Sequence, residues 1–220
     1  MKTIEKVLLF ATTLALICLA IIIFKPWSRN AYYTFQYIRG RALELAKVIE
    51  GKHSARLVKS WSLEDVNLVL VVSKPNEEPL TIDLSYERLK VYVPIHAREV
   101  GIIRGSPPDK HFEFFRRVCV YHVGSFIVVD PKPVVKHYIV NEYGRTSHIV
   151  EITLFRIGGV LEPGCVLSFA NSSRVIFLRC YDYPGTVSVT INDQEVLSFN
   201  VDPSNVLRVI IVYEVWYAKS

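Results

Sequence analysis

The residues best suited to chemistry in this 220-residue chain are its cysteines and histidines. Cys180, in the stretch FLRCYDY, and His122 supply a thiol and an imidazole, the groups of a cysteine nucleophile and its base. That chemistry also needs an arginine beside the oxyanion of the reacting group. The next expected strand, residues 186–192, contains no arginine, and Arg208 lies far along the chain. We therefore predict no catalytic residue and keep a cysteine transpeptidase as a remote alternative.

Metal and cofactor motifs are not recognisable in the sequence. The chain has no Cys-x-x-Cys, His-x-His or His-Glu-x-x-His spacing, no glycine-rich phosphate loop and no nucleophile elbow. His122 and His137 could meet across strands, but unliganded histidines are the ordinary expectation. We predict no cofactor and no metal site. The histidines are dispersed at positions 53, 96, 111, 122, 137 and 148.

The other cysteines and one asparagine indicate on which side of a membrane the domain would lie. Cys165 and Cys180 flank a candidate hairpin at residues 166–179, and a disulfide there would stabilise the fold by roughly 3 kcal/mol. Two reduced cysteines fit the pattern equally well, and Cys119 has no evident partner. Asn171 begins an Asn-Ser-Ser sequon, a candidate glycosylation site. Together these features favour an extracytoplasmic domain.

The elements that must position these residues begin with an apolar segment. Val7 to Phe24 contains no charge and, as a helix, would be about 27 Å long, close to the thickness of a bilayer's hydrocarbon core. We therefore predict a single-pass transmembrane anchor at residues 1–28, a cell-membrane location and the lipid bilayer as a partner. A cleavable signal peptide is the alternative, and the flanking lysines and arginines do not decide the orientation.

Residues 29–52 are predicted to form a juxtamembrane amphipathic helix. Its apolar residues recur at three- and four-residue steps, and Gly51 is a suitable terminator. We expect this stripe to pack on the domain that follows, with a membrane surface or a partner helix as the alternatives. The stripe consists of Phe35, Ile38, Ala42, Leu45 and Val48 or Ile49.

From about residue 57 the apolar period changes from 3.6 to 2. Leu68, Leu70 and Val72 share one face, and short runs of this kind alternate with proline, glycine and asparagine turns. The pattern predicts a mostly β fold, an antiparallel immunoglobulin/fibronectin-like sandwich. We expect a sandwich domain at residues 53–158 and a smaller second β unit at 159–220 packed on it.

One stretch, VNLVLVVSKPNEEPLTIDLSYERLKVYV, resembles the water-stress and hypersensitive-response (WHy) domain of type 2 late-embryogenesis-abundant proteins. Pro75 and Asn76 match two positions of that family's Asn-Pro-Asn turn, and Lys74 replaces the first asparagine. The resemblance covers roughly residues 60–140. It implies a sandwich without a catalytic site, and some members of the family are anchored by one N-terminal helix.

Charge and composition narrow the remaining functions. The 26 Lys and Arg against 21 Asp and Glu give a net charge of +5, but the basic residues are scattered, so we expect no nucleic-acid partner. The leading hypothesis is a membrane-anchored, non-enzymatic interaction or envelope-protective module, with another envelope protein as a candidate partner. The alternative is a structural subunit of a surface filament or envelope complex. The remote enzymatic alternative is similar to a sortase.

Overall fold

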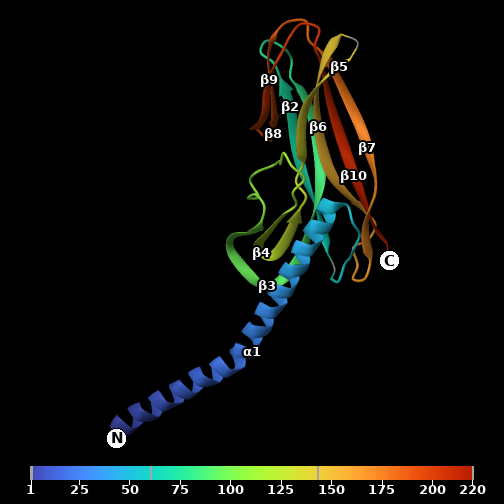
Figure 1. Cartoon of the computed structure of the whole chain (residues 1–220). Coiled ribbons are helices and arrows are strands. Elements are labelled where there is room, and N and C mark those ends of the chain that lie inside the picture. Colours follow the sequence, from blue (N-terminus) through green and yellow to red (C-terminus); the bar gives the residue numbers. More distant parts are fainter. Residues whose placement is uncertain (1, 60, 143, 220) are drawn as a thin grey trace.

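The computed structural model describes residues 2–59, 61–142 and 144–219, with side chains described for residues 9–20 and for the residues of these ranges from 29 onward. Within these ranges the chain forms one long helix, α1 (Lys2–Gly51), followed by ten strands (Figure 1). The expectation of a mostly β protein is confirmed. The strands are β1 (Ala55–Arg56), β2 (Ser62–Ser73), β3 (Leu80–Arg104), β4 (Cys119–Asp130), β5 (Val134–Glu142), β6 (Arg145–Gly158), β7 (Val166–Cys180), β8 (Gly185–Ile191), β9 (Gln194–Val201) and β10 (Val206–Lys219).

The strands form two five-stranded sheets. Sheet A has the order β1-β7-β10-β6-β5, and sheet B has the order β4-β3-β2-β8-β9. Sheet B is antiparallel throughout, but β10 and β6 run parallel in the middle of sheet A. The predicted antiparallel immunoglobulin/fibronectin-like sandwich is therefore wrong. Alternation with period 2 shows that a segment is a strand but carries no information about the direction of its neighbour.

Both halves of the chain contribute to both sheets. β8 and β9 extend sheet B from the edge of β2, and β10 lies between β7 and β6 in sheet A. Segments 53–158 and 159–220, expected to be two units, thus share two hydrogen-bonded sheets. The β2–β3 hairpin turns at Lys74-Pro75-Asn76, where the amide of Glu77 donates to the carbonyl of Lys74 at 3.2 Å. Asn76 has φ 65°, a left-handed conformation that asparagine tolerates.

Helix α1 corrects the prediction of two N-terminal helices. It continues through Pro26 to Gly51, so the juxtamembrane helix expected at residues 29–52 is the C-terminal part of one element. Crossing a bilayer takes about 20 consecutive apolar residues, and the part of the chain that the structure describes offers no helix that is long and apolar enough. The predicted transmembrane anchor, single-pass topology and cell-membrane location are therefore wrong. Of the predicted span Val7 to Phe24, the side chains of residues 7–8 and 21–24 lie outside those described.

The C-terminal part of α1 forms a core with both sheets. Ile38, Ala42, Leu45 and Ile49, the residues of the predicted stripe, are at most 3% exposed, which confirms that the stripe packs on the β fold. They join side chains of β3, β4, β6 and β10 in one cluster, which also contains Trp61 and Trp216. A second cluster lies between the two sheets away from the helix and is built mainly from β2, β3, β6, β8 and β10. The C-terminal part of α1 therefore packs against both sheets at one end of the β fold (Figure 1).

Candidate functional site

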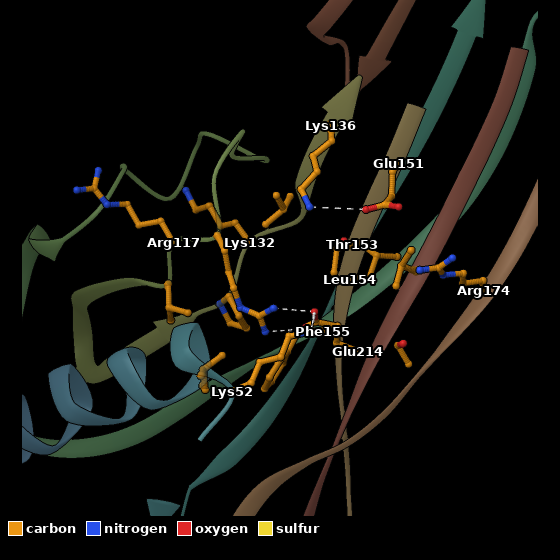
Figure 2. A pocket seen from close by; sticks show the side chains of 17 residues that line it. Lys52, Arg117, Lys132, Lys136, Glu151, Thr153, Leu154, Phe155, Arg174 and Glu214 are labelled. Atoms are coloured by element: carbon orange, nitrogen blue, oxygen red, sulfur yellow. Dashed lines mark hydrogen bonds and ion pairs between the residues drawn. The ribbon is translucent and has the colours of Figure 1, made fainter. Parts of the chain in front are cut away.

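A pocket of about 250 Å³ lies where the C-terminal end of α1 meets one face of sheet A. Alternate residues of a strand point to one face of the sheet. The residues of β5, β6, β10 and β7 that point to this face form the floor of the pocket. One row of cross-strand partners runs Val134, Thr153, Val212 and Arg174. The end of α1, the loop after β3 and the link between β4 and β5 form its walls (Figure 2).

The pocket lining is strongly cationic. Six lysines and arginines face only two carboxylates, Glu151 and Glu214, among its lining residues. Opposite charges would be expected to balance in a purely structural cluster, because unpaired like charges repel. The excess of positive charge makes the pocket a site that favours an anion. The cations are Lys52, Arg116, Arg117, Lys132, Lys136 and Arg174.

Glu214 on β10 pairs with two of these cations. Its Oε1 accepts from Nη1 of Arg116 at 2.7 Å and lies 2.8 Å from Nζ of Lys52, and its Oε2 accepts from Nη2 of Arg116. Burial alone would raise the pKa of Glu214, but the hydrogen bonds from Arg116 and Lys52 outweigh it and hold the pKa below its usual value. Nε of Arg116 is buried and has no hydrogen-bond partner among the described residues, so one donor remains at the pocket wall.

Two cations at the rim of the pocket, Arg174 and Lys136, make no close ion pair. Arg174 on β7 has no hydrogen-bond or ion-pair partner in the described ranges, and its side chain reaches toward the pocket in Figure 2. Lys136 on β5 is 58% exposed at the side chain, and its Nζ lies 3.8 Å from Oε1 of Glu151. Arg117 lies on the loop on the opposite side, and its side chain points away from the pocket (Figure 2). Arg174 and Lys136 could therefore approach a ligand without breaking a strong internal contact.

Lys132 anchors the loop that forms the pocket wall. It is 3% exposed, and its ammonium donates to Ser106 Oγ at 3.0 Å, to the carbonyl of Lys110 at 2.5 Å and to the carbonyl of Pro107. Burial lowers its pKa, although Cys119, Asp130 and Glu113 counteract the shift. All three N–H donors are used, so Lys132 positions the loop and is not a free ligand for an anion.

The candidate catalytic pair does not come together. Nε2 of His122 lies 3.0 Å from the carbonyl oxygen of Ile95, and its ring contacts Phe35, whereas Cys180 ends β7. Cys165 and Cys180 are both free. The expected hairpin between them is one strand, β7, about 50 Å long. Of the two alternatives for these residues, the structure has the two reduced cysteines, because they lie at opposite ends of that strand.

The remaining sequence-predicted positions are the sequon at Asn171 and the turn at Pro75 and Asn76. Asn171 is exposed, as a glycosylation site must be, and it lies within β7 next to a bulge. Pro75 and Asn76 occupy the predicted turn. No cluster of three or more potential metal ligands occurs among the described residues.

Sequence reasoning missed a stack of aromatic rings that joins the two sheets. His137 of β5 and His148 of β6 stack on Phe199 of β9 with ring centroids 4.3 and 4.8 Å away, and the two imidazoles share a contact of 3.3 Å. Burial lowers the pKa of both histidines, and His148 adds to the shift at His137. Their spacing of eleven residues across a hairpin was the available signal.

Comparison with known proteins yields no matching family, no similar curated protein and no similar solved structure.

Proposed function

We propose that this chain is a non-enzymatic interaction module that binds an anionic group, a carboxylate or a phosphate, in the pocket at the end of α1. The observation that carries the proposal is the excess of cations over carboxylates around one cavity. Charge-assisted hydrogen bonds from arginine and lysine are the strongest contacts available to such groups. The volume of about 250 Å³ fits a small anion or one anionic side chain of a partner.

The arrangement of the lining supports binding over catalysis. The lining residues include neither cysteine nor histidine, and the carboxylate next to Ser172, that of its cross-strand partner Glu214, is already paired with Arg116 and Lys52. The buried pair of Arg116 and Glu214 holds the pocket wall in place, and Lys132 holds the loop. A preorganised cationic wall lowers the cost of ordering side chains around the ligand.

Calorimetric titration with inorganic phosphate and with succinate tests the proposal. Arg174→Gln and Lys136→Gln should each weaken binding about tenfold, because each removes one charge-assisted hydrogen bond worth roughly 1.5–3 kcal/mol. Affinity should also fall as salt rises, since both groups are partly exposed. Arg98→Gln removes an exposed charge of β3 that does not line the pocket and serves as the matched control. Equal losses in the control and the pocket variants would refute the assignment.

A second candidate function is a structural subunit that assembles through α1. Leu9, Phe10, Leu14, Ile17 and Leu19 are 52–70% exposed, and they are distributed around the helix. A helix that is apolar on all sides is normally buried, so copies of this segment packing together would cover it.

Sedimentation velocity of the full chain separates this candidate from the first. Leu14→Glu should reduce assembly strongly, because it buries a charge among apolar side chains. Asn30→Glu places the same charge at an exposed, polar position of α1 outside this apolar segment and is the control. Unchanged assembly in Leu14→Glu would eliminate the helix as the contact.

A further inference from the structure

Strand β7 leaves most of one edge of sheet A without a neighbouring strand in the described chain. β10 pairs with β7 from Val166 to Cys180, whereas β1 pairs only with Val166 and Leu167. Apart from the pairing with β10, none of the backbone hydrogen bonds of the described residues reaches positions 171–180. At about 3.3 Å per residue, this free edge is roughly 33 Å long. Such a row of amides and carbonyls is a template for another strand.

The features that usually protect an edge are weak here. β7 contains no proline and no lysine, and its bulge lies at Ala170, before the free stretch begins. Val175, Ile176 and Leu178 are 45%, 56% and 67% exposed. The edge therefore combines unpaired backbone with exposed apolar side chains.

The two arginines that flank this apolar segment are directed elsewhere. Arg179 lies 3.5 Å from Glu77, and it donates to the carbonyl of Glu78 in the β2–β3 turn. Arg174 reaches toward the pocket in Figure 2. Neither side chain needs to lie across the edge, so a strand could approach β7 without displacing them.

We propose that the free edge of β7 pairs with β7 of a second copy of this chain, antiparallel and about a two-fold axis at Ile176. In this register Ile176 lies opposite itself, and Val175 lies opposite the partner's Phe177, a favourable pairing of β-branched and aromatic residues. Arg174 lies opposite the partner's Leu178, so no arginine opposes another. The two copies of sheet A then form one continuous sheet. Ser172 and Arg174 of this stretch also line the anion pocket, so the proposed contact adjoins it.

The register makes a specific cross-link possible. Ser172 lies opposite the partner's Cys180, and directly opposed residues of antiparallel strands have Cα atoms about 4.5–5.5 Å apart, within disulfide range. Cys180 is exposed and free. The full chain carrying S172C should therefore form a covalent dimer under mild oxidation, resolved on a non-reducing gel. Within one copy the two positions lie eight residues apart along one strand, too far to join.

Matched variants test both the register and the contact. All variants are made in a Cys18→Ser background, because Cys18 is also exposed and free. S173C faces the partner's Arg179 and should stay monomeric under the same oxidation, as should S172C combined with Cys180→Ser. Ile176→Lys places two lysines opposite each other and should reduce the S172C cross-link about tenfold, while Val100→Lys, at an exposed apolar site on β3, should not. Equal cross-linking of S172C and S173C, or none in S172C, would overturn the proposal. Association through α1 would not reproduce this dependence on register.

Discussion

Lys132→Met is expected to lower the free energy of unfolding by about 3 kcal/mol. The ammonium makes three hydrogen bonds, to Ser106 and to the carbonyls of Pro107 and Lys110, and each such bond to a charged group is worth roughly 1.5–3 kcal/mol. The cost of burying the charge, reflected in its lowered pKa, offsets part of this sum. Methionine fills similar space, so the loss reports the hydrogen bonds and not a cavity.

Urea unfolding followed by tryptophan fluorescence measures this change, because Trp61 and Trp216 are 8% and 0% exposed in the folded protein. A loss of this size should also lower the melting temperature by roughly 10 °C in a chain of this length. Lys136→Met is the control, since its exposed ion pair should contribute less than about 0.5 kcal/mol. A loss below about 1 kcal/mol for Lys132→Met would show that the wall loop does not depend on the ammonium.

Three further predictions concern the turn, the histidine stack and the pocket. Asn76→Gly should leave the urea midpoint nearly unchanged, whereas Asn76→Val should cost about 1–2 kcal/mol, because valine is strained at φ 65°; equal midpoints would contradict the strain. The folded state lowers the pKa of His137 and His148, so the neutral imidazoles contribute their full share to the free energy of unfolding above about pH 6.5. This contribution is lost as the pH falls below that value, by at most about 1.4 kcal/mol per pH unit for each imidazole. Urea midpoints between pH 7.5 and 5 should show this slope, and His137→Phe should flatten it; an unchanged slope would exclude the stack. Glu214→Gln should destabilise the protein by about 2 kcal/mol and yet tighten phosphate binding, because it frees Arg116; weaker phosphate binding in calorimetry would refute the role of the excess charge.

Local patterns predicted the local elements well. The stripe of Ile38, Ala42 and Leu45 identified the face of α1 that packs, because residues three and four apart share one side of a helix. The turn at Pro75 and Asn76 followed from residue preferences for its backbone conformation. Both features depend on a few neighbouring residues.

Long-range features could not be predicted in the same way. Lys132 lies between two prolines and reads as an exposed turn residue, but tertiary contacts bury it. The pocket takes cations from the residue that follows α1, from two loops and from strands β5 and β7, so no short stretch of sequence contains the whole site. The apolar run at the N-terminus gave a correct helix and an incorrect transmembrane assignment, because composition alone does not establish a membrane span.

The position of β10 has a consequence for the order of folding. This strand follows β6 and β7 in the chain, yet it lies between them, so Ser147 meets Val206 and Leu207 meets Arg179 only after both have been synthesised. Until β10 arrives, β6 and β7 have no common neighbour, and the apolar faces of both strands remain open. Contacts of such sequence separation slow folding, since the loop must close before they form. A nascent chain would therefore pass through a state with two exposed strand edges, in which β10 from another copy could insert by domain swapping.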